Sequence, residues 1–148
     1  MKRRVLKKLI DFNEDEKETL EQMEEEEAKV VKVHDGDTVT LRFSFWDFDV
    51  PFRILDINAP EMNEIGGILS RDYLKKRLLG KKVTVILGEQ KIEKWGRMLG
   101  NILSDGMDIG EELILMGFAT PFDDREDGKF PAEEKAFEEG RIAKEWQS

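Results

Sequence analysis

The segment formed by residues 52–61 constrains the fold of this chain more than any other. It starts as a β-strand in which Phe52 and its alternate neighbours face one side and Arg53 faces the other. Pro60 has no N–H to donate to a strand ladder, so we expect the strand to end just before it. The strand and the proline then fix the distance between Arg53, whose planar guanidinium suits a phosphate, and Glu61, a carboxylate on the next loop.

The flanking sequence predicts a small β-barrel with helices. Valine-rich segments at residues 28–34 and 37–45 predict two strands that meet at Asp35-Gly36, where we expect the glycine to supply a positive φ for a tight turn. A third strand at residues 48–57 completes a meander, which is how a small barrel begins. Periodicity and turn residues predict the remaining elements, which are helices at residues 69–79, 108–116 and 131–146 and strands at residues 82–87 and 91–103, the last interrupted at Gly96.

The composition indicates one soluble domain. A length of 148 residues suits a single domain, and no stretch approaches the roughly 18 apolar residues that cross a bilayer, so we expect no membrane partner. The chain has no cysteine and one histidine, His34, so we expect neither disulfides nor a zinc centre, and any metal should be a hard cation with oxygen ligands. The basic start has no apolar run after it, so we expect a cytoplasmic protein, or a secreted one if a signal peptide was removed.

The net charge of −9 argues against a protein that coats nucleic acid, because such proteins bind mainly through Lys and Arg. The charge is uneven, however. Residues 1–27 and 123–148 carry −4 each, whereas residues 28–122 carry only −1. Lys and Arg also cluster at residues 71–82 and 91–97, so the sequence predicts a local basic groove with weak, salt-sensitive binding.

The acidic start of the chain is predicted to stand apart from the barrel. We place a charged arm at residues 1–27, either disordered or partly helical, because Leu20 and Met23 are too few apolar residues to bury a helix face. The barrel domain then spans residues 28–148. The arm is either a solubilising tail or an acidic mimic that covers the basic groove.

Three motifs follow one another in this chain. They are the turn Asp-Gly-Asp-Thr-Val at residues 35–39, the segment Arg-Ile-Leu-Asp-Ile-Asn-Ala-Pro-Glu at residues 53–61, and Lys-Trp-Gly-Arg at residues 94–97. In this order and spacing they resemble the staphylococcal nuclease family, and the resemblance extends over about residues 28 to 122. It implies an α+β, mainly β fold, an OB-type five-stranded barrel with three helices.

The resemblance implies three catalytic residues. Arg53 and Arg97 match arginines that contact the scissile phosphate, where a guanidinium fork neutralises developing charge better than a Lys. Glu61 matches the glutamate proposed to activate the attacking water, although a carboxylate is a weak base at neutral pH. The alternative is structural, with Arg53 in a salt bridge to Asp56 or Glu61 and Arg97 in a surface pair.

The resemblance also implies a calcium site. Asp37 and Asn58 match the metal-binding side chains, the backbone carbonyl of Ala59 adds an oxygen, and Glu61 contributes through a water. Calcium takes six to eight oxygen ligands, so waters and phosphate must supply the rest. Family members usually carry an aspartate where this chain has Asn58, so we expect weaker calcium binding or an altered metal preference.

Lys94 and Trp95 match a Lys-Tyr pair that contacts the substrate in family members. Tryptophan loses the hydroxyl but offers a larger surface on which a base can stack. Packing of Trp95 in the core is an equal alternative. Residues 118–123 lack the tyrosines that flank the base in type members, which bears on affinity more than on the reaction.

The activity implied by the resemblance is a metal-dependent phosphodiesterase. It would hydrolyse DNA and RNA with little sequence preference, favour single strands and leave 3′-phosphate ends, and we expect a monomer. The alternative is a catalytically weak or inactive OB module that binds nucleic acid or a protein partner, since OB barrels serve many functions. Retention of Arg53, Glu61 and Arg97 together favours the enzyme.

Overall fold

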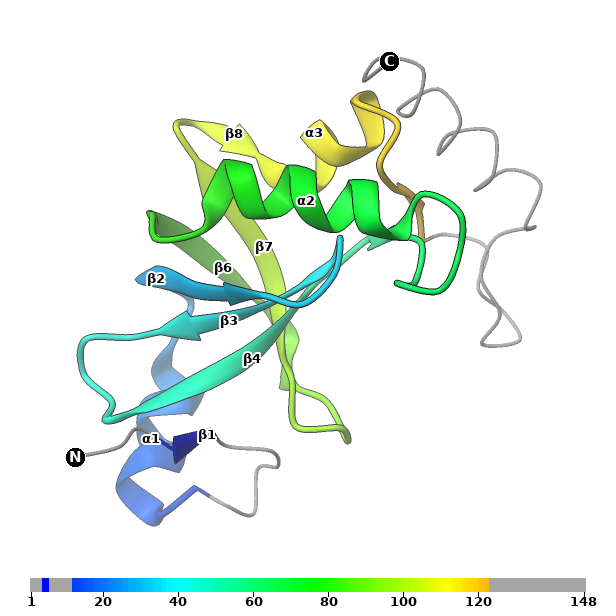
Figure 1. Cartoon of the computed structure of the whole chain (residues 1–148). Helices are drawn as coiled ribbons and strands as arrows, with labels where there is room; N and C mark the ends of the chain where they lie inside the picture. The colour runs from blue at the N-terminus through cyan, green and yellow to red at the C-terminus, as the bar shows by residue number, and fades with distance from the viewer. Residues whose placement is uncertain (1–3, 6–11, 123–148) are drawn as a thin grey trace.

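The structure is a computed structural model of the whole chain, and it describes residues 4–5 and 12–122 (Figure 1). Its strands are β1 (Arg4–Val5), β2 (Glu25–Val33), β3 (Thr38–Arg42), β4 (Phe48–Ile54), β5 (Ile57–Asn58), β6 (Lys82–Ile92), β7 (Met98–Ser104), β8 (Met107–Asp108) and β9 (Thr120–Pro121). Its helices are α1 (Glu14–Gln22), α2 (Gly67–Leu78) and α3 (Ile109–Leu115). The helix expected at residues 131–146 lies outside the described residues.

Five of these strands close into a mixed barrel. The strand order is β4-β3-β2-β6-β7, and a further pairing between β4 and β7 joins the two ends. Neighbours in the barrel are antiparallel except β4 and β7, which run parallel with Phe52 opposite Met98. The OB-type five-stranded barrel expected from the sequence is therefore confirmed, within an α+β fold that is mainly β.

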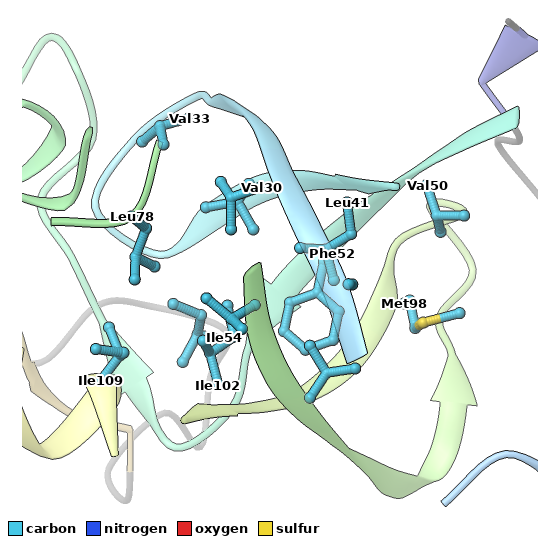
Figure 2. Close-up of a cluster of buried hydrophobic side chains, with 14 of the residues drawn as sticks. Val30, Val33, Leu41, Val50, Phe52, Ile54, Leu78, Met98, Ile102 and Ile109 are labelled. Carbon is cyan, nitrogen blue, oxygen red and sulfur yellow. The ribbon is translucent and has the colours of Figure 1, made fainter. Parts of the chain in front are cut away.

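Apolar side chains fill the interior of the barrel (Figure 2). Phe52 and Ile54 on β4 are fully buried, as are Met98 and Ile102 on β7. Each such side chain contributes about 1.5–3 kcal/mol relative to an exposed one. Because side chains alternate along a strand, this register directs Arg53 to the outer face of β4.

The strand expected at residues 48–57 is interrupted, so that prediction is wrong in its extent. β4 ends at Ile54, Asp56 adopts a positive φ of 68°, and the chain resumes as β5, which pairs with β9. A positive φ is uncommon for a residue with a side chain, although Asp tolerates it better than most. Nothing in the local hydrophobic pattern indicated this turn.

The second half of the barrel also differs from the expected boundaries. β6 extends to Ile92 instead of ending at residue 87, and residues 93–97 form the loop of a β6–β7 hairpin. Gly96 in this loop has a φ of 86°, which requires glycine or strains any other residue. The loop therefore carries the Lys-Trp-Gly-Arg motif at the tip of two long strands.

The helices α2 and α3 lie together at one end of the barrel (Figure 1). Leu74 and Leu78 of α2 are fully buried, whereas Leu79, expected on the same face, is exposed beyond the helix end. Arg77 donates to Glu112 of α3 at 3.0 Å and to the Ser104 carbonyl at 3.1 Å, so it joins both helices to β7 and does not contribute to an open basic groove. Within residues 4–5 and 12–122, no helix is long and apolar enough to cross a membrane.

The helix α1 lies at the opposite end of the barrel from α2 (Figure 1). The expectation that Leu20 and Met23 cannot bury a face is wrong, because both are buried together with Phe12. Phe12 packs edge-on against Trp46, and both belong to the same buried cluster as Leu20 and Met23. The first barrel strand also starts at Glu25, three residues before the expected domain boundary.

A lysine on β6 holds the end of α1. Lys91 Nζ donates to the carbonyls of Leu20 and Glu21 at 3.1 and 2.6 Å, and the last turn of α1 has no basic residue of its own. We expect Lys91→Met to lower the free energy of unfolding by about 1–2 kcal/mol, because a cation then no longer satisfies helix-terminal carbonyls. Urea unfolding measures this change. Lys82→Met, which removes an exposed lysine on the same strand, is the control and should cost well under half as much.

Candidate active site

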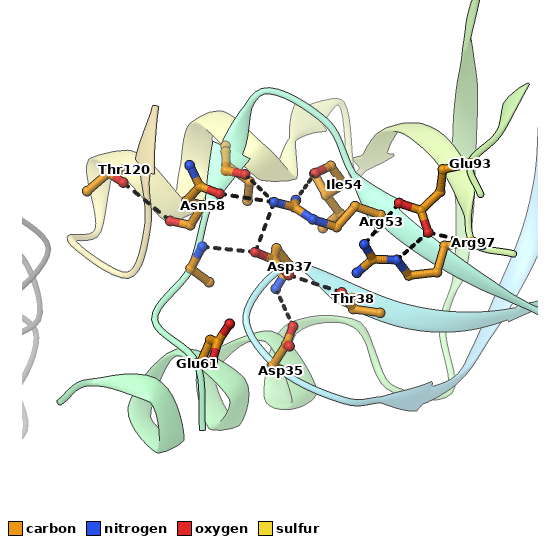
Figure 3. Close-up of polar contacts among 12 residues, drawn as sticks. Asp35, Asp37, Thr38, Arg53, Ile54, Asn58, Glu61, Glu93, Arg97 and Thr120 are labelled. Atoms are coloured by element: carbon orange, nitrogen blue, oxygen red, sulfur yellow. Dashed lines mark hydrogen bonds and ion pairs between the residues drawn. The ribbon is translucent and has the colours of Figure 1, made fainter. Parts of the chain in front are cut away.

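A polar cluster surrounds the guanidinium of Arg53 on the outside of the barrel (Figure 3). Arg53 Nη2 lies 3.3 Å from Asp37 Oδ2, and donates to the Ile57 carbonyl at 2.9 Å and to Asn58 Oδ1 at 3.2 Å. Nη1 donates to the Ile54 carbonyl. The ion pair seen for Arg53 is thus with Asp37, rather than with Asp56 or Glu61 as the structural alternative supposed.

The break between β4 and β5 makes this cluster possible. In a continuous strand the carbonyls of Ile54 and Ile57 would have pointed into the ladder. The turn at Asp56 instead leaves them beside the Arg53 side chain, where they accept its hydrogen bonds. The interruption that the sequence analysis missed therefore orients the arginine.

Asp37 is the buried carboxylate of the site. Its Oδ2 accepts from the Ala59 N–H at 3.0 Å, and its Oδ1 accepts from the Thr38 hydroxyl at 3.0 Å. Burial raises the pKa of Asp37 to about 6, with the negative charge of Asp35 adding to the rise and Arg53 opposing it. The contact of Ala59 with the site is the hydrogen bond from its N–H to Asp37. The expected metal ligation by its carbonyl stays a prediction.

Two glycines allow the loop that follows β5 to pack this closely. Gly36 does not have the positive φ expected for it. A Cβ there would instead lie 2.6 Å from the Ala59 Cβ, so a side chain would push the loop away from Asp37. A Cβ on Gly67 would lie 1.9 Å from the Glu61 carbonyl oxygen, so any residue larger than glycine would clash with the backbone there as well.

Arg97 is the last residue of the loop that joins β6 to β7. Its Nε donates to Glu93 Oε1 at 2.8 Å and its Nη2 to Glu93 Oε2 at 3.0 Å (Figure 3). The hydrogen bond to Glu93 is the main cause that raises the pKa of Arg97, and the charges of Asp37 and Asp35 raise it further. Figure 3 draws Arg97 on the same side of the barrel as Arg53, and the two line one pocket.

Both arginines line one pocket of about 390 Å³. Arg97 is the more accessible of the two, with 32% of its side chain exposed against 12% for Arg53. The other lining residues are Ile54, Leu55, Asp56, Gln90, Glu93, Leu99 and Phe122. No lining residue belongs to α1, so the described part of the acidic arm does not cover this pocket.

Glu61 lies on the loop beyond Ala59 and is exposed, outside the residues that line the pocket. Its N–H donates to Glu64 Oε1 at 2.7 Å, which fixes the backbone of the loop. Figure 3 draws its side chain below the Asp37 cluster, near Asp35, with no dashed contact to either arginine. The structure thus brings Arg53, Arg97, Asp37 and Asn58 together and places Glu61 at their margin.

Two accessible aromatic side chains lie on segments that carry site residues, and one of them, Phe122, lines the pocket. Trp95 at the hairpin tip is 68% exposed, which excludes the core-packing alternative, and Lys94 Nζ lies 5.0 Å from its ring centre. Phe122 was not predicted as a site residue, because the resemblance implied tyrosines in this region and the chain has none there. Phe122 lines the pocket, and the Arg53 guanidinium carbon lies 5.8 Å from its ring centre. No signal in the sequence marks it, because β9 and its pairing with β5 become apparent only in the structure.

The oxygen donors are of the type that calcium prefers, but only one of the two side chains is charged. Asp37 supplies a carboxylate and Asn58 an amide oxygen, both hard ligands. Arg53 Nη2 contacts both of these oxygens, so a cation would compete with the guanidinium. In the part of the chain that the structure describes, no three His, Asp or Glu side chains gather to hold a metal.

Comparison with known proteins identifies the family of the chain. Residues 51–147 match the family described as staphylococcal nuclease homologue. The chain is 34% identical over 97 residues to a protein of Escherichia coli O157:H7 named uncharacterized endonuclease, which covers 65% of this chain and 61% of that protein. It is 31% identical over 121 residues to endonuclease YhcR of Bacillus subtilis (strain 168), covering 70% of this chain and 10% of that protein.

The chain thus spans about three fifths of the Escherichia coli relative that it matches. The family match covers more than half of the chain and includes Arg53, Asn58, Glu61 and Arg97, while Asp37 lies before its first residue. The motifs, the closed barrel and this match agree with one another, and the chain belongs to the family of staphylococcal nuclease homologues.

Proposed function

We propose that this chain is a metal-dependent nuclease that hydrolyses DNA and RNA with little sequence preference. The observation that carries the proposal is one pocket lined by two guanidinium groups beside a buried carboxylate and amide. The two guanidinium groups suit a phosphodiester, and relatives named endonuclease support the same reaction class. Single strands are favoured because an exposed Trp95 and a pocket-lining Phe122 can stack unpaired bases.

The proposed reaction is attack of a water on phosphorus with departure of the 5′ oxygen. The new P–O bond forms as the P–O5′ bond breaks, a proton passes to the departing oxygen, and the phosphate stays on the 3′ end. Arg97 and Arg53 neutralise charge on the non-bridging oxygens, where positioned donors act most strongly. Glu61, exposed at the margin of the site, orients the attacking water and takes its proton.

Calcium is the proposed metal, held by Asp37, Asn58 and the Ala59 carbonyl. When bound, it would supply positive charge that stabilises the negative charge on a phosphate oxygen. Asn58 and the competing contact from Arg53 make this a weak site, which waters and substrate complete.

A metal-by-substrate screen tests the proposal. The protein is incubated with labelled single-stranded DNA, duplex DNA and RNA, first with calcium, magnesium or manganese and then with a chelator. We expect cleavage in calcium that the chelator abolishes, with single strands cut fastest and products that carry 3′-phosphate. Binding without cleavage in every metal would contradict the proposal and would favour a binding module.

Asn58→Asp is expected to tighten calcium binding by about tenfold or more, because ligand charge sets calcium affinity. Asn58 is buried, so the added carboxylate should also destabilise the metal-free protein. Thermal unfolding with increasing calcium measures both effects, as a lower Tm without metal and a larger rise with it. Asn63→Asp, at an exposed loop position, is the control. An equal calcium-dependent rise in Asn58→Asp and in the unsubstituted protein would remove Asn58 from the metal site.

A further inference from the structure

A carboxylate lies inside the pocket that is proposed to receive phosphate. Glu93 lines it together with Arg53 and Arg97, and only 15% of its side chain is exposed. A negative group in this place repels a phosphodiester, so binding alone gives no reason for it. Its contacts with Arg97 indicate what it does.

Glu93 grips Arg97 through the side chain and the backbone. Its two carboxylate oxygens accept from Nε and Nη2, an arrangement that fixes the plane of the guanidinium. The Glu93 N–H donates to the Arg97 carbonyl at 2.9 Å, and the Gly96 N–H donates to the Glu93 carbonyl at 2.9 Å. Glu93 therefore fixes both the backbone of the loop between β6 and β7 and the direction of the Arg97 guanidinium.

The hydrogen bonds between Glu93 and Arg97 leave Nη1 of the guanidinium for a substrate. Neither bond to Glu93 uses Nη1, and Arg97 lines the pocket in this orientation. Both carboxylate oxygens of Glu93 are already engaged by Arg97, so the contacts of Glu93 are with the arginine.

We propose that Glu93 is a positioning residue that holds Arg97 for the transition state and, by its charge, weakens binding of the substrate's ground state. This inference rests on the proposed nuclease function. An interaction of this kind raises turnover at the expense of affinity, because only differential stabilisation of the transition state speeds a reaction. Its signature is that turnover and affinity change in opposite directions when Glu93 is replaced.

The test compares Glu93→Ala, Glu93→Gln and the control Glu89→Gln. Glu89 is exposed on the same strand and does not line the pocket, so its replacement makes the same charge change elsewhere. Turnover is measured with a quenched single-stranded oligonucleotide in calcium. Binding of a labelled oligonucleotide is measured by fluorescence anisotropy in a chelator, and thermal unfolding verifies the fold of each variant.

We expect kcat to fall about tenfold to a hundredfold in Glu93→Ala, as misplacement of a catalytic group does. Glu93→Gln should fall less, because its amide oxygen can still accept from Arg97. Both variants should bind the oligonucleotide severalfold more tightly than Glu89→Gln does.

An unchanged kcat in Glu93→Ala would overturn the inference, as would a parallel loss of turnover and affinity. If the unsubstituted protein binds the oligonucleotide but cleaves it in no metal, the proposed function fails. The inference is then decided by affinity alone: equal Kd values for Glu93→Gln and Glu89→Gln overturn it, and tighter binding by Glu93→Gln supports the charge effect in the pocket.

Discussion

Arg97→Ala is expected to lower turnover by more than about a hundredfold while the protein keeps its fold. Removal of one preorganised donor from a developing charge costs about 10²–10³ in kcat, and Arg97 is the more accessible guanidinium in the pocket. Arg97 is partly exposed but Glu93 is mostly buried and loses both of its donors, so the free energy of unfolding should fall by about 1–3 kcal/mol. Steady-state cleavage and urea unfolding measure the two effects.

Two variants control this experiment. Arg71→Ala removes an arginine that pairs with Asp72 on the surface of α2, away from the pocket, and should leave turnover unchanged. Arg97→Lys keeps the charge but loses the fork, so its turnover should lie between those of the alanine variant and the unsubstituted protein. Turnover within threefold of normal in Arg97→Ala would remove Arg97 from the catalytic site.

Local signals explain most of what the sequence predicted correctly. Gly80 and Gly117 both have positive φ where helices end, as glycine commonly does beyond a helix. Asp108 caps α3 by accepting from the Glu111 N–H at 3.0 Å. These signals, with alternating apolar residues in the strands, predict individual helices and strands because each concerns residues close in sequence. The closed five-stranded barrel was implied by the resemblance of the three motifs to the family.

The features that escaped prediction depend on contacts between distant segments. Leu20 and Met23 are buried in the same core cluster as Trp46, which comes from the loop between β3 and β4. Glu93 stands four residues before Arg97, a spacing that reads equally well as a surface pair until the hairpin places both in a pocket. The site motifs fixed the order of the functional residues, whereas their orientation required the tertiary structure.

Arg53→Ala is expected to destabilise the protein by about 3–5 kcal/mol near neutral pH, in addition to impairing turnover, because it leaves a buried carboxylate without its cation. Both partners of the ion pair are largely buried, and the charge of Arg53 opposes the rise that burial causes in the pKa of Asp37. Without the arginine, the pKa of Asp37 in the folded state should rise further above the ordinary value of 3.8. Equilibrium unfolding in urea, with a chelator present, measures the loss.

The pH dependence distinguishes this cause from a simple loss of packing. A carboxyl group whose pKa is raised by folding stabilises the protein fully below its unfolded pKa, and that stability is lost as the pH rises through the folded pKa. Near pH 4, below the folded pKa of about 6, Asp37 is protonated in both proteins, so there the variant should differ least from the unsubstituted protein. The difference should grow as the pH rises to 7.5, where Asp37 is charged and only the unsubstituted protein pairs it.

A second substitution isolates the buried charge. Arg53→Ala/Asp37→Asn has no carboxylate to leave unpaired, and the amide oxygen of asparagine can still accept from the Ala59 N–H. The double variant should therefore be more stable than Arg53→Ala at pH 7.5 and should lose the additional pH dependence. If the two variants are equally stable at pH 7.5, or if the cost of Arg53→Ala is the same at pH 4 and pH 7.5, then the hydrogen bonds of Arg53 to the Ile54 and Ile57 carbonyls, and not its charge, hold this site together.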